Sequence, residues 1–175
     1  MLPAAFGLEA KTVRLVPYDL RWPALYEAEA ERIRAALGEH LLAIEHVGST
    51  AVPGLMAKPI LDIQVAVASF VVGGPLINAL ESIGYQHRPE DPIPGRLYFS
   101  LSREGLRTHQ IHLCEAGGRN WRDRLRFRDL LRADAQLATA YVALKRDLAA
   151  RHANDRLAYA TGKDQFIATA LALAR

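Results

Sequence analysis

The sequence predicts an α/β (α+β) fold, in which a mixed β-sheet flanked by helices is followed by a helical C-terminal part. Segments that alternate between apolar and polar residues occur only before about residue 120. From about 120 to 175 Leu, Ala, Arg and Asp dominate, and breaks at Asp134 and Asn154-Asp155 predict about three helices. With 175 residues, no internal repeat and no linker-like tract, we expect one domain over residues 1–175.

The first part of the chain is predicted to form a strand, a helix and a second strand. Residues 13–16 are a short run of β-type residues. The segment that opens at Trp22 carries apolar residues at helical spacing, with charged residues between them, and Gly38 is expected to end this helix. Residues 41–47 predict a strand that runs directly into Gly48-Ser49-Thr50.

The middle of the chain is predicted to form one more helix and three more strands. Residues 60–67 show the best-defined strand pattern, and a helix is expected over about 73–84. Residues 96–102 and 106–115 alternate like paired strands, and the Arg-Glu-Gly segment between them is typical of a hairpin turn. These segments supply the sheet on which the candidate site is placed below.

Composition and charge exclude several classes of protein. Lys and Arg number 22 against 19 Asp and Glu, and a net charge of +3 argues only weakly for nucleic-acid binding while an anionic small ligand remains compatible. The single cysteine, Cys114, cannot form an internal disulfide and is expected to be buried and inert. No signal-peptide pattern is present, and no apolar stretch reaches the roughly 18 to 20 residues of a membrane span. We expect a cytoplasmic protein without membrane contact, and no pattern indicates its oligomeric state.

A glycine and two hydroxyl residues come directly after a predicted strand. Gly48 permits close approach of the backbone to a ligand, and Ser49 and Thr50 offer hydroxyl groups beside backbone N–H groups. This arrangement predicts a phosphate-binding loop, with an ordinary turn as the alternative. Lys58 follows the loop and is a further candidate for a phosphate contact, with an ion pair to Asp62 as its alternative.

Asp62 lies in the middle of the best-defined strand. Because strand side chains alternate, Asp62 and Gln64 share one face with Ile60 and Ala66, and the other face is formed by Leu61, Ile63, Val65 and Val67. A carboxylate there requires a hydrogen bond, a cation or a metal ion, so Asp62 is a candidate site residue, and an exposed sheet face is the alternative. The same alternation in the last strand makes His112 a candidate metal ligand or general base, with a hydrogen-bonded histidine on a half-buried sheet as the alternative, whereas His109 is expected to pack.

The order of these residues covers nearly the whole chain. The run EHVGSTAVPGL at 45–55 is followed by AKPILDI at 57–63, with PYD at 17–19 and RWP at 21–23 upstream. Downstream lie FRD at 127–129, LR at 131–132, and a late pattern of Tyr141, Lys145, Tyr159, Lys163 and Phe166. Together these motifs closely resemble the GrpB family. The resemblance implies a fold of the nucleotidyltransferase superfamily, and GrpB-like domains also occur fused to dephospho-coenzyme A kinase in some bacteria.

The superfamily pattern places a glycine motif shortly before a strand that carries two acids. Here Gly48-Ser49 is followed, after twelve residues, by Asp62-Ile63-Gln64-Val65, so Gln64 stands where the second acid is expected. Two carboxylates on one strand face hold a pair of magnesium ions against a triphosphate. The resemblance implies a divalent metal on Asp62 and a third acid on a later strand, where this chain has histidines instead. His112, chosen by strand alternation, is the candidate that binds the metal together with Asp62; this set suits magnesium or manganese, with zinc as a further candidate because of the histidine.

Basic residues are densest between Arg122 and Arg132. Arg124, Arg128 and Arg132 align on one helix face at four-residue spacing, and Arg128 is the candidate for a phosphate contact; a solvated face neutralised by neighbouring acids is the alternative. Lys145 and Lys163 recur near aromatic residues, for which we expect helix packing with the ammonium groups reaching solvent. Recognition of a nucleotide base is the alternative there.

Three functions are consistent with the sequence. The first is metal-dependent nucleotidyl transfer from a nucleoside triphosphate to an unknown acceptor, with Gly48 and Ser49 on the phosphates and Asp62 with His112 on the metal. The second is a non-catalytic module that binds a nucleotide or phosphate metabolite, linked to coenzyme A metabolism by the fusion, and Gln64 supports it. The third, RNA binding through the arginine-rich helix, is disfavoured by the small net charge.

Overall fold

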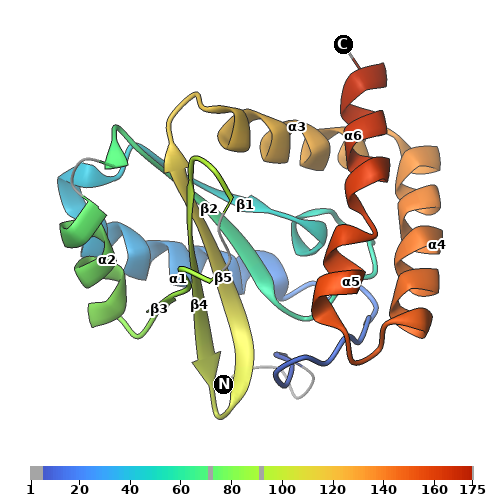
Figure 1. Cartoon of the computed structure of the whole chain (residues 1–175), viewed down its shortest axis with the longest axis horizontal. Coiled ribbons are helices and arrows are strands. Elements are labelled where there is room, and N and C mark those ends of the chain that lie inside the picture. Colours follow the sequence, from blue (N-terminus) through green and yellow to red (C-terminus); the bar gives the residue numbers. More distant parts are fainter. Residues whose placement is uncertain (1–5, 71–72, 91–92, 175) are drawn as a thin grey trace.

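The computed structural model describes residues 6–70, 73–90 and 93–174. At its centre lies a five-stranded mixed sheet with the strand order β1-β2-β5-β4-β3 (Figure 1). The strands are β1 (Ala43–Val47), β2 (Leu61–Val67), β3 (Gln86–His87), β4 (Arg96–Arg103) and β5 (Leu106–Glu115). Strands β2 and β5 run parallel, whereas β1 with β2, β5 with β4 and β4 with β3 pair antiparallel. The predicted mixed sheet is confirmed.

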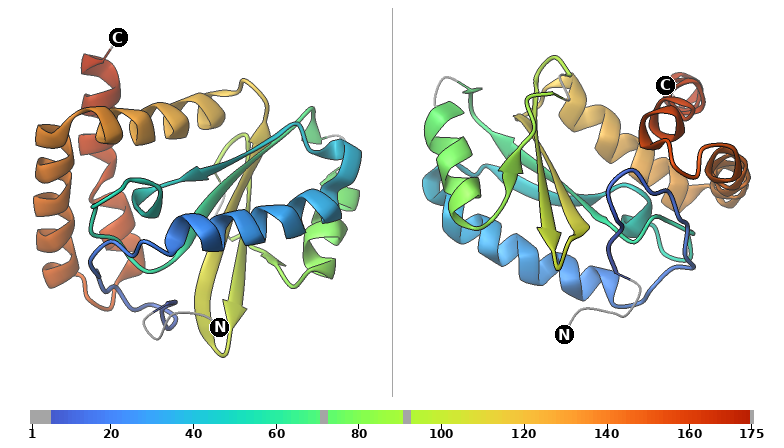
Figure 2. Two further views of the ribbon diagram at one scale, coloured as in Figure 1. Left: turned by 180° about the vertical axis from the view of Figure 1, so that it is seen from behind. Right: turned by 60° about the horizontal axis from the view of Figure 1, so that its bottom comes forward.

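Helices lie on both sides of this sheet. They are α1 (Trp22–Leu37), α2 (Gly73–Ser82), α3 (Arg119–Ala133), α4 (Ala135–Arg151), α5 (Arg156–Thr161) and α6 (Asp164–Leu173). Figures 1 and 2 show α1 and α2 against one face of the sheet, with α3 and the group α4 to α6 on the other side. None of the helices in the described ranges combines the length and apolar character that crossing a membrane requires.

The side chains of β2 alternate as predicted. Leu61 and Ile63 are fully buried and belong to the main hydrophobic core, together with Ile33 of α1 and Leu80 of α2. Asp62 belongs to the opposite face, and its side chain is 28% exposed. The apolar face thus fixes the strand against α1 and α2, and Asp62 is left facing the C-terminal helices.

A second hydrophobic cluster attaches the C-terminal helices to the loop between β1 and β2. Val52 and Leu55 of this loop are buried together with Phe127 of α3, Tyr141 of α4 and Ala170 of α6. Tyr141 packs edge-on against Phe127, with ring centroids 5.2 Å apart. This packing fixes the position of the glycine loop relative to α3, α4 and α6.

Three predictions of local structure are wrong. Residues 13–16 form no strand; Val16 alone makes a bridge, through two backbone bonds with Ala57, because Pro17 has no N–H to continue the pairing. Strand β3 was missed, since two residues carry no periodic signal. The C-terminal part has a further break at Gly162, so α3, α4, α5 and α6 stand where about three helices were predicted; a Cβ on Gly162 would lie 2.5 Å from a methyl carbon of Leu148 in α4.

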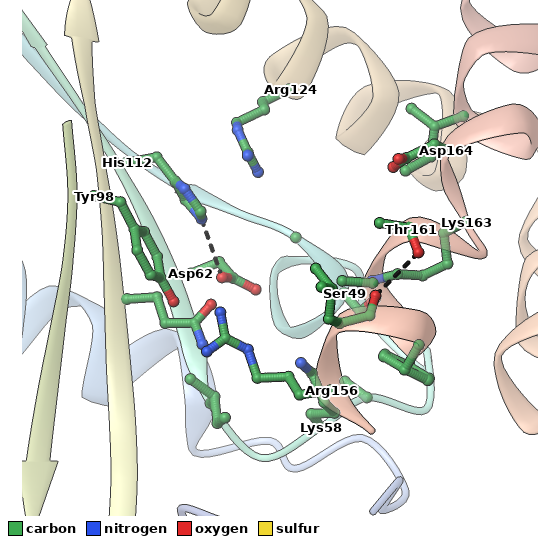
Figure 3. A pocket seen from close by; sticks show the side chains of 18 of the residues that line it. Ser49, Lys58, Asp62, Tyr98, His112, Arg124, Arg156, Thr161, Lys163 and Asp164 are labelled. Carbon is green, nitrogen blue, oxygen red and sulfur yellow. Dashed lines mark hydrogen bonds and ion pairs between the residues drawn. The ribbon is translucent and has the colours of Figure 1, made fainter. Parts of the chain in front are cut away.

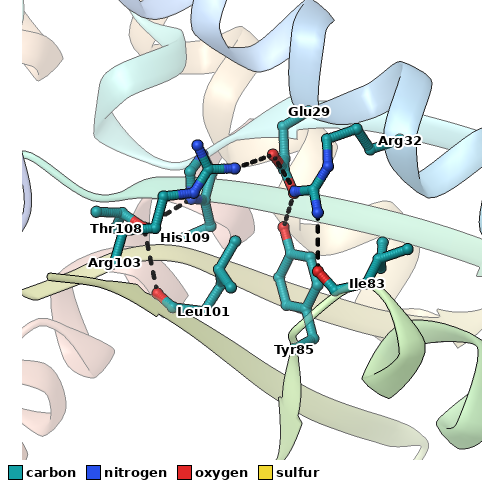
Figure 4. Close-up of polar contacts among 8 residues, drawn as sticks. All are labelled: Glu29, Arg32, Ile83, Tyr85, Leu101, Arg103, Thr108 and His109. Atoms are coloured by element: carbon teal, nitrogen blue, oxygen red, sulfur yellow. Dashed lines mark hydrogen bonds and ion pairs between the residues drawn. The ribbon is translucent and has the colours of Figure 1, made fainter. Parts of the chain in front are cut away.

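A buried acidic residue connects α1 to the sheet. The side chain of Glu29 is 4% exposed and accepts bonds from Arg32 Nη1 (2.6 Å), Arg103 Nη2 (3.0 Å) and the Tyr85 hydroxyl (3.0 Å) (Figure 4). Arg32 also donates to the carbonyl oxygen of Ile83, beyond the end of α2. These bonds join α1, β4 and the segment after α2 on the face of the sheet away from the cavity described next.

Candidate functional site

A cavity of about 1180 Å³ lies between the polar face of the sheet and the C-terminal helices. Gly48, Ser49, Thr50, Lys58, Asp62 and His112 all line it, so the structure brings together the residues predicted from the loop and the strands. The basic side chains that line it are Lys11, Lys58, Arg88, Arg96, Arg107, Arg124, Arg128, Arg156 and Lys163; the acidic ones are Asp62, Glu90, Asp123, Asp155 and Asp164. The excess of basic groups favours an anionic ligand.

Gly48 and Asp62 are in direct proximity. Strand β1 pairs with β2 so that Val47 lies opposite Asp62, and Gly48 follows immediately. The backbone of Gly48 has φ 71° and ψ −169°, a region that is essentially restricted to glycine. A Cβ on Gly48 would lie 2.6 Å from Asp62 Oδ2. Glycine is therefore required both by the turn and by the aspartate beside it.

Asp62, His112 and Arg96 form a chain of contacts across three strands. His112 Nε2 lies 3.3 Å from Asp62 Oδ1, and Arg96 Nη1 lies 3.1 Å from His112 Nδ1 (Figure 3 shows the first contact). Burial and the charge of Arg124 lower the pKa of His112 to about 4, so the imidazole is neutral at pH 7. Burial raises the pKa of Asp62. The hydrogen bond from His112 and the charge of Lys58 lower this pKa by more, so the net shift is downward.

Gln64, at the place of the second acid, does not reach the cavity. It is fully buried, and its amide nitrogen donates to the carbonyl oxygen of Asn120 (2.9 Å) at the start of α3. No group of three or more His, Cys, Asp or Glu side chains suited to a metal ion occurs in the part of the chain that the structure describes. The donor set around Asp62 therefore does not fit the pair of magnesium ions that the superfamily implies.

The hydroxyl groups of Ser49 and Thr50 in the glycine loop make hydrogen bonds to buried side chains of the protein. Ser49 Oγ accepts a bond from Lys145 Nζ (3.0 Å), and Lys145 also donates to the carbonyl oxygen of Met56. Thr50 Oγ1 lies 3.0 Å from His46 Nε2, and Thr50 is 1% exposed. Lys145 is itself 1% exposed, so the expectation that its ammonium group reaches solvent is wrong. It anchors the loop instead, and burial together with the charges of neighbouring lysines lowers its pKa to about 7.

Lys58 and Lys163 both contact the ring of Tyr159. Their ammonium nitrogens lie 5.2 Å and 4.8 Å from its centroid. Burial, and then the charge of Lys163, lower the pKa of Lys58 to about 7. Both lysines line the cavity, and such crowding of cations is relieved by a bound anion.

Arg128 and Arg124 differ in how far their charge is already paired. Arg128 donates to Glu45 Oε2 (2.7 Å), Asp129 Oδ1 (2.8 Å) and the carbonyl oxygen of His46 (2.9 Å), so it serves to hold α3 against β1. Arg124 makes no hydrogen bond or ion pair within the described ranges, and Figure 3 shows it pointing into the cavity. Helical spacing places both on one face, but the sequence carries no signal that separates their roles.

Residues 12–173 match the family model described as "GrpB protein". The chain belongs to the GrpB family. It is 36% identical over 171 residues to the protein YqkA of Bacillus subtilis, a match that covers 97% of this chain and 50% of YqkA. It is also 31% identical over 176 residues to a dephospho-CoA kinase of Mycolicibacterium paratuberculosis, covering 87% of this chain and 43% of that protein. The chain thus spans about half the length of these relatives.

Two solved structures have a similar fold. The crystal structure of the conserved protein GrpB from Enterococcus faecalis has a TM-score of 0.83 and 34% identity, with 92% of this chain and 96% of that chain covered. The Cid1 poly(U) polymerase, solved with MgGTP bound, has a TM-score of 0.54 and 16% identity, with 77% of this chain and 44% of that chain covered. The predicted nucleotidyltransferase-like fold is therefore confirmed.

Proposed function

We propose that this GrpB-family protein binds a phosphorylated small molecule, a nucleotide or a phosphate metabolite, in the cavity between the sheet and the C-terminal helices. The observation that carries the proposal is the set of cations directed into the cavity. Arg124 makes no hydrogen bond or ion pair within the described ranges, and Lys58 and Lys163 contact one aromatic ring. Burial and then the charge of Lys163 lower the pKa of Lys58, and burial together with the charge of Arg124 lowers the pKa of Lys163. A bound phosphate group supplies the negative counter-charge for these three basic side chains.

The glycine loop contributes shape to the proposed phosphate site. Gly48 lines the cavity and carries no side chain of its own, so a ligand can approach its backbone beside Asp62. Lys145 and the contacts of Thr50 fix the loop, so its geometry is set before the ligand arrives. Asp62, 28% exposed on the same wall, is the group available for a hydroxyl of the ligand.

Nucleotidyl transfer is the second candidate. The likeness of the fold to the Cid1 poly(U) polymerase and the order of Gly48-Ser49 and Asp62 favour it. Because Asp62 is the one carboxylate of β2 and Gln64 is withdrawn, the residues do not fit a pair of magnesium ions, and we derive no metal-assisted step. Pyrophosphate release from a nucleoside triphosphate that is lost in Asp62→Asn would establish this candidate.

The ligand class is tested by calorimetry on the whole chain with ATP, GTP, CTP, UTP, dephospho-coenzyme A and pyrophosphate. Dephospho-coenzyme A is included because of the relatives named dephospho-CoA kinase. Each titration is run once with magnesium and once with EDTA. We expect at least one probe to bind without metal, and Arg124→Met to weaken that binding by about 10- to 100-fold, the range for loss of a charge-assisted bond.

The matched control is Arg119→Met on the same helix. Arg119 is 89% exposed and pairs with Asp123 at the surface, so its loss should leave binding within about twofold of wild type. Equal losses in the Arg119 and Arg124 variants would contradict the proposed site. Absence of binding for every probe would contradict the proposed function.

A further inference from the structure

We infer that His112 is a positioning residue for Asp62 and not a metal ligand, so that the Asp62 carboxylate serves as a metal-free acceptor for a hydroxyl group of the ligand. This inference deepens the proposed function and rests on it for the identity of the ligand. It replaces the expectation that Asp62 and His112 share a divalent metal.

The tautomer of His112 follows from the chemistry of its neighbour. A guanidinium group has only hydrogen-bond donors, so Arg96 Nη1 must donate to His112 Nδ1 across the 3.1 Å between them. Nδ1 is then the unprotonated nitrogen of the neutral ring, and the proton resides on Nε2. Nε2–H donates to Asp62 Oδ1 at 3.3 Å. Both ring nitrogens are therefore occupied.

Metal coordination by His112 would require this arrangement to reverse. A metal ion binds an imidazole through a nitrogen lone pair. The lone pair of Nδ1 faces Arg96, and Nε2 could offer one only if its proton moved to Nδ1, where it would oppose a guanidinium N–H. Arg124 and Lys58 add positive charge around Asp62, and both lower its pKa. Basic side chains therefore surround the Asp62 carboxylate, whereas a metal ion bound there would need further anionic ligands.

The second oxygen of Asp62 remains for the ligand. Oδ1 is held by His112, and Figure 3 shows the other oxygen on the side away from His112 and toward the cavity. Oδ2 sits in the space that a side chain at position 48 would fill, 2.6 Å from the ideal Cβ of Gly48. An ionised carboxylate accepts hydrogen bonds and repels phosphate, so the ligand group that meets it is a hydrogen-bond donor, which we assign as a hydroxyl. The ligand therefore carries a hydroxyl group close to its phosphate, as in a phosphorylated sugar or a nucleotide.

The first experiment reads the protonation of the ring nitrogens and needs no ligand. In the whole protein labelled with ¹⁵N-histidine, long-range ¹H–¹⁵N spectra at pH 7 should show His112 with a proton on Nε2 and none on Nδ1. Two equivalents of Zn²⁺ should leave this pattern unchanged, and Mn²⁺ should broaden His112 no more than His109, which lies on the opposite face of β5. An Nδ1–H tautomer, or displacement of the Nε2 proton by Zn²⁺, would overturn the inference.

Variants at position 96 test what fixes the tautomer. Arg96→Met removes the donor, and we expect a signal for Nδ1–H to appear, whereas Arg96→Lys keeps a donor and should retain the wild-type pattern. An unchanged pattern in Arg96→Met would refute the role of Arg96. If that variant does not fold, the wild-type spectrum and its metal titration still decide the main point.

The second experiment tests the hydroxyl with two defined probes, inorganic phosphate and ribose 5-phosphate, both in EDTA. We expect ribose 5-phosphate to bind about tenfold more tightly, the value of one hydrogen bond to a charged acceptor, and Asp62→Asn to abolish the difference. His112→Gln, which keeps a donor, should retain more of the difference than His112→Leu. Equal affinity for the two probes would overturn this inference and leave phosphate binding standing, while binding of neither would instead contradict the proposed function.

Discussion

Gly48→Ala is the perturbation that the structure specifies most closely. The residue has φ 71° and ψ −169°, a conformation that costs an L-residue about 1 to 3 kcal/mol. The added methyl group would also lie 2.6 Å from Asp62 Oδ2 and 3.0 Å from Asp62 Cβ. Since these atoms belong to a paired strand, the carboxylate has to turn, and its bond to His112 is lost. We expect a total destabilisation of about 3 kcal/mol.

Two comparisons separate the cost of the strained backbone conformation from the steric clash between the added methyl group and Asp62. Gly54 also has a positive φ, 78°, but a Cβ there meets no atom within 4 Å, so Gly54→Ala should cost only about 1 kcal/mol. Asp62→Ala removes Oδ2 and Cγ, and in that background Gly48→Ala should cost about 1 kcal/mol less than in the wild type. The wild type, Gly48→Ala, Asp62→Ala and their double variant form a thermodynamic cycle.

The assay is urea unfolding followed by circular dichroism, with thermal unfolding as a second measure. For a chain of this size, 3 kcal/mol corresponds to a fall in Tm of about 6 to 12 °C. Measured well below the Tm of each variant, the affinity for the phosphate ligand should fall far more in Gly48→Ala than in Gly54→Ala. Equal destabilisation by the two glycine variants, or no coupling with Asp62→Ala, would refute the reasoning.

Three further predictions concern buried polar groups. Glu29→Gln should destabilise by about 2 kcal/mol, measured in urea, because a buried carboxylate with two arginine partners is lost. Burial lowers the pKa values of His46, His109 and His112 from 6.5 to about 4, so the unfolded chain takes up more protons in this window, and Tm should fall as the pH falls from 6.5 to 4. Lys145→Met should weaken phosphate-ligand binding by about tenfold in calorimetry, since Ser49 loses its donor.

Each of these has a matched control. Glu31→Gln, on the same helix but in an exposed pair with Arg34, should change stability by less than about 0.5 kcal/mol, and an effect equal to that of Glu29→Gln would contradict the first prediction. His109→Gln should flatten the acid limb of the Tm curve by about a third, because one of three titrating groups is gone. Arg146→Met, on the exposed side of α4, should bind as wild type; a loss equal to that of Lys145→Met would contradict the loop-anchor role.

Several site features could be predicted from the sequence because their causes are local. Strand alternation placed Asp62 and His112 on one face and left His109 to pack, where it lies against the ring of Phe6. Turn chemistry placed Gly48 at the end of β1, and β1 pairs with β2 so that this turn meets Asp62. In the hairpin between β4 and β5, Glu104 and Gly105 both have positive φ values, and the glycine there was expected.

Other features depended on how the helices dock. Arg124, Arg128 and Lys145 look alike in the sequence, yet the first points into the cavity, the second is held by Glu45, and the third is buried under Ser49. Arg128 and Lys145 have partners that lie some 80 to 100 positions away in the sequence. A local sequence pattern therefore does not show which of these cations is paired.

The sequence by itself determined the family, the sheet with its helical C-terminal part, and the meeting of a glycine turn with one strand aspartate. The tertiary structure alone decided which charges surround that aspartate. It buried Gln64 beneath α3, set Arg96 against Nδ1 of His112, and directed Arg124 into the cavity. The physical reason is that backbone pairing follows from periodicity, whereas the protonation and charge of a site follow from every group that folding brings within a few ångströms.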